Sequence, residues 1–129
     1  MEPSQLVNRL GKYLYKNIES AYNIEYRPHE CDISMTVLYE IPRDIMRMYP
    51  QEFKDVMDTL NEMNISLSLV GYGDKVRMNL ISEDTGEQTL GQKIYPMDKL
   101  LNSREAKQLI LRDIHKILNK SFEKYEFIF

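Results

Sequence analysis

The clearest pattern along the chain is a strict alternation of apolar and polar residues over positions 31–41. The odd positions from Cys31 to Ile41 are apolar, and the even positions are mostly polar. A period of two places successive side chains on opposite faces of a strand, so one face is buried and the other meets water. The pattern therefore predicts a half-buried strand, which Pro42 ends.

The same alternation returns in three shorter segments after residue 64. Strands are predicted at 65–69 and 76–80, with a tight turn at Gly71–Asp74 between them, and a weaker strand at 87–95 with Leu90 and Ile94 on one face. A second turn is expected at 83–86. Strands joined by such short turns are typical of an antiparallel meander.

Three segments have helical spacing instead. The first is capped by Ser4 and is expected to end near Tyr22–Asn23. After a short helical turn at 44–48, a second helix is predicted from Pro50, and a third from Asn102. Their apolar stripes are Leu6, Val7, Leu10, Leu14, Ile18 and Ala21 in the first, Phe53, Val56, Met57, Leu60 and Met63 in the second, and Leu109, Ile110, Ile114, Ile117 and Leu118 in the third.

The order of these elements predicts one α+β domain over residues 1–129. We expect two layers: a mainly antiparallel sheet of four to five strands, with three helices packed on one face (α-β-α-β-β-β-α). The tail from Tyr125 to Phe129 is rich in aromatic side chains, so it should dock as an edge strand or a core plug. Asn17 falls within the first apolar stripe, and we expect its amide to be buried, either on a backbone partner or inside a helix–helix interface.

Charge is distributed unevenly along the chain. The net charge is −3, but residues 99–124 carry seven Lys/Arg against three acids, a net +4, which leaves −7 on the rest. A helical projection of the last helix places several polar residues away from its apolar stripe. This candidate partner-binding set consists of Arg104, Gln108, Arg112, His115 and Lys116. Such a face can dock phosphates or an acidic protein, or it can be a plain solvated surface.

Several groups of residues resemble catalytic or ligand-binding sites, but their spacing or position argues against each one. His29, Glu30 and Cys31 supply the residue types of a cysteine nucleophile, yet the parity of Cys31 points its thiol into the core. One cysteine and two distant histidines lack zinc-ligand spacing. The segment 71–73 is followed by a strand, whereas a phosphate loop precedes a helix. We therefore predict no catalytic residue, no metal site and no cofactor, and we interpret the acidic turn at 83–87 as solvated.

Composition indicates the cellular compartment and the type of genome. A lone cysteine favours a reducing compartment, and the sequence shows neither a signal peptide nor a membrane-length apolar run, so we expect a cytoplasmic protein that does not bind membranes. The scarcity of alanine favours an AT-rich genome, such as that of a phage or a low-GC bacterium. Met46, Met48, Met57 and Met63 are interpreted as core filling, with an adaptable binding surface as the alternative.

Three classes of function are compatible with these patterns. We favour a non-enzymatic protein-interaction module, such as a small regulator or adaptor, whose partner is another protein or a second copy in a homodimer. The second class is a protein that binds the nucleic-acid backbone through the basic last helix. The third is a small enzyme whose site is assembled from residues distant in sequence.

Overall fold

The computed structural model describes residues 1–54, 60–84, 86 and 88–128. Its elements follow one another along the chain as α1 (Pro3–Asn17), β1 (Ala21–Arg27), β2 (Glu30–Glu40), α2 (Arg43–Met48), α3 (Pro50–Phe53), β3 (Asn61–Tyr72), β4 (Lys75–Ser82), β5 (Gln88–Pro96), a 3-10 turn η1 (Met97–Lys99), α4 (Ser103–Ser121) and β6 (Glu126–Ile128). The predicted α+β class is confirmed.

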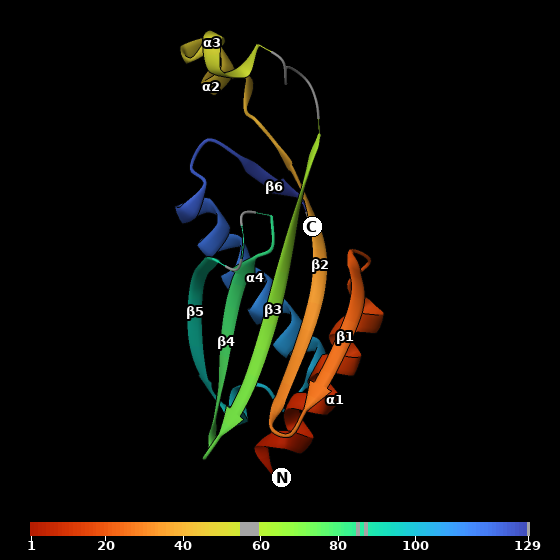
Figure 1. Cartoon of the computed structure of the whole chain (residues 1–129). Coiled ribbons are helices and arrows are strands. Elements are labelled where there is room, and N and C mark those ends of the chain that lie inside the picture. The colour runs from red at the N-terminus through yellow and green to blue at the C-terminus, as the bar shows by residue number, and fades with distance from the viewer. Residues whose placement is uncertain (55–59, 85, 87, 129) are drawn as a thin grey trace.

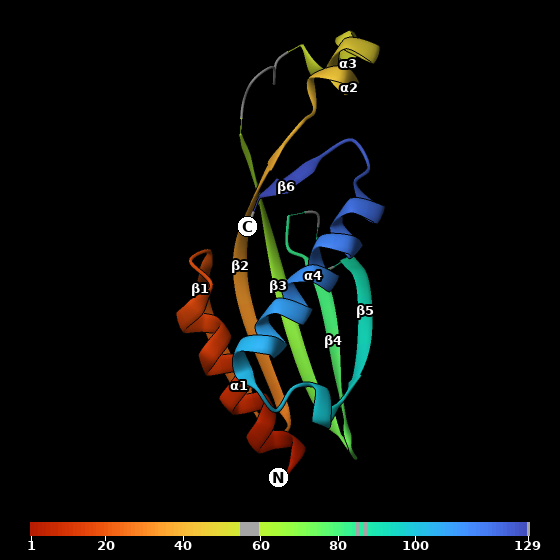
Figure 2. The ribbon, with the colours of Figure 1, turned by 180° about the vertical axis from the view of Figure 1, so that it is seen from behind.

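The described strands form one antiparallel sheet in the order β1-β2-β3-β4-β5, and β6 adds to β2 beyond the end of β1. Helices α1 and α4 cover one face, while none of the described helices lies on the opposite face (Figure 1, Figure 2). The second predicted helix, from Pro50, does not cover this sheet: α2 and α3 lie at the far end of the long β2 and β3 strands (Figure 1). Six described strands replace the expected four to five.

The core is built from the inward parity of the strands and the apolar stripes of α1 and α4. Ile33 lies opposite Leu67, and Leu67 lies opposite Leu80, so one apolar row crosses three strands. Leu10 of α1 and Ile110 of α4 pack on these rows with no exposed surface. The alternation in β2, β3 and β4 therefore places their apolar residues on the buried face of the sheet, as the sequence predicted.

The first helix is shorter than expected, and an unpredicted strand follows it. Helix α1 begins at Pro3, where the Gln5 side chain accepts a hydrogen bond from the Glu2 amide at 3.1 Å, and it ends at Asn17. The predicted continuation to Tyr22–Asn23 is wrong because residues 21–27 pair with β2 as β1. Pro28 and His29 form the turn between the two strands, and His29 has φ = 63°.

The second helix was also predicted too long. Residues 50–53 form α3, Val56 and Met57 lie outside the described residues, and Met63 belongs to β3, opposite Val37. Of the four methionines considered above, Met46 packs with Ile41 and Phe53 in a small second cluster, and Met63 is in the main core. The side chain of Met48 is exposed.

A bulge in β5 reverses the expected facing of its residues. Leu80 pairs with Gly91 and Ile81 with Thr89, so Leu90 is the extra residue. Beyond the bulge, Tyr95 points into the core, and Ile94, predicted to share a face with Leu90, is exposed. The docked tail, in contrast, is confirmed: β6 pairs with Leu38–Glu40, and Phe127 is buried. Phe129 lies outside the described residues.

Candidate interaction surfaces

Helix α4 presents one buried face and one solvent face. Asn102 caps it by accepting a hydrogen bond from the Glu105 amide at 3.0 Å, as the capping-box pattern predicted. Ala106, Ile110, Ile114 and Leu118 are buried. The opposite side contains the residues selected from the sequence: Arg104, Gln108, Arg112 and Lys116 are exposed, and His115 is partly exposed.

A buried polar contact fixes α4 on the sheet. The Tyr95 hydroxyl of β5 donates to the Asp113 carboxylate of α4 at 2.6 Å, and both side chains are almost fully buried. Burial, and then this hydrogen bond, raise the pKa of Tyr95 above its ordinary value. Breaking this bond would leave a carboxylate without a partner inside the protein, which is costly. The contact therefore opposes rotation of α4 about its own axis and fixes which side of the helix faces solvent.

The basic segment 99–124 is divided between different places in the fold. Arg104, Arg112 and Lys116 lie on the solvent side of α4. Lys124 instead forms an ion pair with Glu52 at 2.7 Å and lies over the ring of Tyr49. We call the set Arg104, Gln108, Arg112, His115 and Lys116 the α4 outer face.

The residues around Cys31 have separate structural roles. Cys31 has no exposed surface, packs against Gly11, and has its pKa raised to about 12 by burial and by the neighbouring Asp32. Arg27 forms ion pairs with Glu30 and Asp32. A nucleophilic cysteine needs a lowered pKa and access to solvent. Cys31 has neither property.

We expect Cys31 to react slowly with a disulfide reagent in the native protein. At pH 8, a pKa of about 12 leaves roughly one thiol in ten thousand as the reactive thiolate. Burial restricts access further, so labelling should be at least about a hundredfold faster in denaturant, and absorbance of the released thiol would measure both rates. Native labelling as fast as that of a free thiol would contradict the register of β2.

The two turns considered as ligand loops also have structural explanations. Gly73 and Asp74 connect β3 to β4, so the segment 71–73 belongs to a hairpin, as predicted. In the acidic turn, the Asp84 carboxylate accepts hydrogen bonds from the backbone and side chain of Asn64, and Glu83 accepts one from Tyr22. Glu87 lies outside the described residues. The described part of the chain contains no group of three or more potential metal-ligating side chains.

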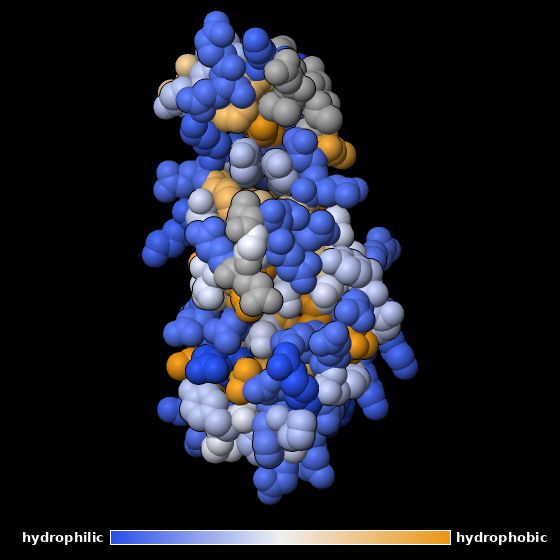
Figure 3. Space-filling view, viewed as in Figure 1, coloured by the Kyte–Doolittle hydropathy of each residue, from blue (hydrophilic) through white to orange (hydrophobic). Residues whose placement is uncertain are grey.

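The sheet face opposite α1 and α4 is a second candidate surface. Asp32, Ser68 and Asn79 form a polar row across β2, β3 and β4, and the face is largely hydrophilic (Figure 3). Part of this polarity is satisfied internally, because Thr36 donates to the Asn64 side chain at 2.9 Å. The face is therefore a polar surface whose groups partly bond to one another.

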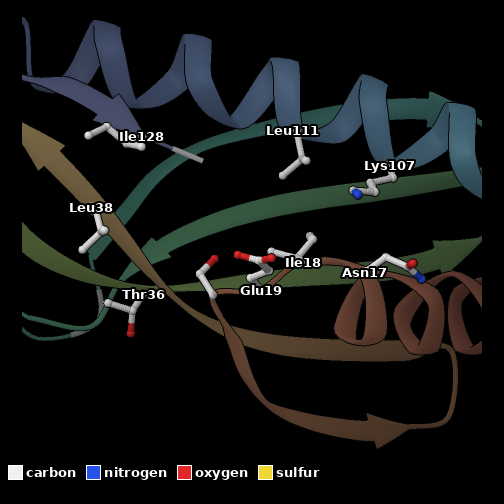
Figure 4. A pocket seen from close by; sticks show the side chains of 9 residues that line it. Asn17, Ile18, Glu19, Thr36, Leu38, Lys107, Leu111 and Ile128 are labelled. Atoms are coloured by element: carbon white, nitrogen blue, oxygen red, sulfur yellow. The ribbon is translucent and has the colours of Figure 1, made fainter.

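A groove of about 760 Å³ is the third surface, and the sequence did not predict it. It lies between α4 and the end of α1 (Figure 4). Asn17 is at its rim, exposed, with its Nδ2 donating to the Tyr13 carbonyl oxygen at 2.8 Å. The expected burial of Asn17 is wrong: it is the last residue of α1, its side chain is exposed, and its amide bonds back to the last turn of the helix.

Comparison with known proteins identifies no relative of the chain. No protein-family model matches it, no curated protein matches it, and no solved structure matches it. Within the described residues, no helix is long and apolar enough to cross a membrane. What the chain binds must consequently be inferred from its own surfaces.

Proposed function

We propose that the chain is a non-enzymatic protein-interaction module, a small regulator or adaptor that binds an acidic protein partner through the α4 outer face. One observation carries the proposal: Arg104, Arg112 and Lys116 are exposed together on a helix whose orientation is fixed by buried contacts. These cations lie on a chain that is otherwise acidic. Clustered exposed cations attract anionic partners and accelerate their encounter.

Capture of partners from cells, followed by mass spectrometry, tests the proposal. The immobilised full-length chain should retain one or a few acidic proteins, and nuclease treatment should not release them. A nucleic-acid backbone also carries negative charge, and it is the competing class of partner. Binding to DNA or RNA with a steep dependence on salt, together with loss of the captured proteins after nuclease treatment, would replace the proposed protein partner with nucleic acid.

Charge reversal on the α4 outer face should separate binding from folding. Exposed charges rarely contribute more than about 1 kcal/mol to stability, so changing Arg104, Arg112 and Lys116 to Glu should leave the circular dichroism spectrum intact. The same variant should bind the captured partner at least about tenfold more weakly, as measured by calorimetry.

The matched control changes Lys16, Lys75 and Lys93 to Glu, which alters the net charge of the chain equally. These three lysines are exposed but lie outside α4. The control should bind the partner nearly as well as the unchanged chain. Equal weakening in both variants would show a response to net charge alone and would contradict a specific α4 surface.

A further inference from the structure

The groove lies where the edge of the sheet changes from one strand to another. β1 pairs with β2 as far as Met35, and β6 pairs with β2 from Leu38 onward. Between these two strands the Thr36 amide donates to the Ser20 carbonyl oxygen at 3.0 Å. The groove opens beside this interruption, with α4 as one wall and the α1–β1 connection as the other (Figure 4).

Four apolar side chains line this groove, and two of them, Ile18 and Leu111, also contact the main core. The even-numbered position of Leu38 in β2 places it on the same side of the sheet as the polar residues of that strand. Ile128, its register partner on β6, is 44% exposed. Leu111 of α4 and Ile18 at the end of α1 complete the apolar lining. Four aliphatic side chains around a volume of about 760 Å³ match the size and polarity of sites that bind small ligands.

The charged groups of the groove favour an anion at one end. Lys107 extends from α4 into the groove, is partly buried, and forms no ion pair with any other described residue. An ammonium group beside apolar surface attracts an anion more strongly than one in open water. Glu19 on the opposite wall is exposed, so water screens its charge.

We propose that the groove binds a medium-chain aliphatic carboxylate. The ligand carboxylate would lie on the Lys107 ammonium, and its alkyl chain would contact Ile18, Leu38, Leu111 and Ile128. This site is distinct from the one proposed for the protein partner, because the lining of the groove includes Lys107 and Leu111 of α4 but none of the five residues of the α4 outer face.

Titration of the ¹⁵N-labelled full chain with octanoate tests the proposal by NMR. The amides of Ile18, Lys107, Leu111 and Ile128 should shift in a saturable way. Affinity should rise from hexanoate to octanoate by up to about fourfold per added methylene. 1-Octanol, which has the same chain without the charge, should bind at least about tenfold more weakly.

Two substitutions in the groove define the ligand chemistry. Lys107→Met keeps the aliphatic stem and should weaken octanoate binding at least about tenfold, whereas Lys116→Met on the α4 outer face should not change it. Glu19→Gln should leave binding equal or tighten it, since it removes a negative charge. Octanol binding as tight as octanoate, an unaffected Lys107→Met variant, or shifts scattered over the surface would each overturn the proposal. Weaker binding in Glu19→Gln would do the same, because it would indicate a cationic or zwitterionic ligand.

Discussion

Removal of the tail from Tyr125 to Phe129 should strongly destabilise the protein. Phe127 is buried, and the ring of Tyr125 stacks on that of Tyr39 with centroids 4.6 Å apart. Full burial of a large apolar side chain contributes roughly 1.5–3 kcal/mol, so Phe127 alone would account for about that much, and the partly buried Tyr125 adds a smaller share. The truncated chain should therefore unfold far below the parent in a thermal melt, or it should precipitate.

Single substitutions in β6 keep this prediction measurable if the truncated chain does not fold. Phe127→Ala should cost about 3–5 kcal/mol, which corresponds to a fall in Tm on the order of 10–20 °C. Ile128→Ala is the control in the same strand, since 44% of Ile128 is exposed against 5% of Phe127, and it should melt much closer to the parent. Equal Tm values for the parent and Phe127→Ala would contradict the docking of the tail.

The second large effect is expected from Gly11→Ala. In an exposed helix this change stabilises by about 1 kcal/mol. Here the added methyl group would overlap the buried sulfur of Cys31, so helix α1 and strand β2 would have to separate. Overpacking of this kind typically costs about 1–3 kcal/mol and occasionally more, so urea unfolding should show a clear loss of stability.

A double-mutant cycle with Cys31→Ala isolates the contact. Removing the sulfur leaves space that the new methyl group at position 11 can occupy, so the double variant should recover much of the stability lost in Gly11→Ala. The two changes should therefore be strongly non-additive. Additive losses, or a stabilising Gly11→Ala, would show that α1 does not pack on β2 at this point.

The parts of the fold that the sequence predicts are those with an uninterrupted local pattern. The alternation in β2 is enough to place Cys31 and Val37 on the same face. The spacing of three residues between Asn102 and Glu105 is enough to predict the start of α4. Aromatic content alone indicated that the tail docks. Each of these features depends on residues close together in sequence.

The incorrect predictions concern residues that fit both a helical and a strand period. Other incorrect predictions concern residues whose structure depends on pairing with a strand distant in sequence. Ile18 and Ala21 continue the spacing of α1, but pairing with β2 draws residue 21 into a strand. Met63 fits a helical stripe and a strand alternation equally well, and its pairing with Val37 decides between them. The bulge at Leu90 exchanged the faces of Ile94 and Tyr95, which no local pattern predicts.

The candidate surfaces also differ in whether local sequence is enough to predict them. The α4 outer face could be placed from the sequence because a helical projection needs only one helix. The Tyr95–Asp113 hydrogen bond that orients this helix could not, because it joins two elements whose relative register was unknown. The groove combines residues of α1, β2, α4 and β6, so it required the complete topology.

Lysine footprinting of the complex with the captured partner tests the central claim most directly. Three exposed or partly exposed lysines report on different surfaces: Lys116 on the α4 outer face, Lys107 in the groove, and Lys75 at the end of the sheet. Modification with an acylating reagent, with and without the partner, gives the rate at each lysine by mass spectrometry. The proposed function predicts that the partner slows modification of Lys116 several-fold and leaves Lys75 and Lys107 unchanged. Protection of Lys75 with Lys116 still fully reactive would contradict it.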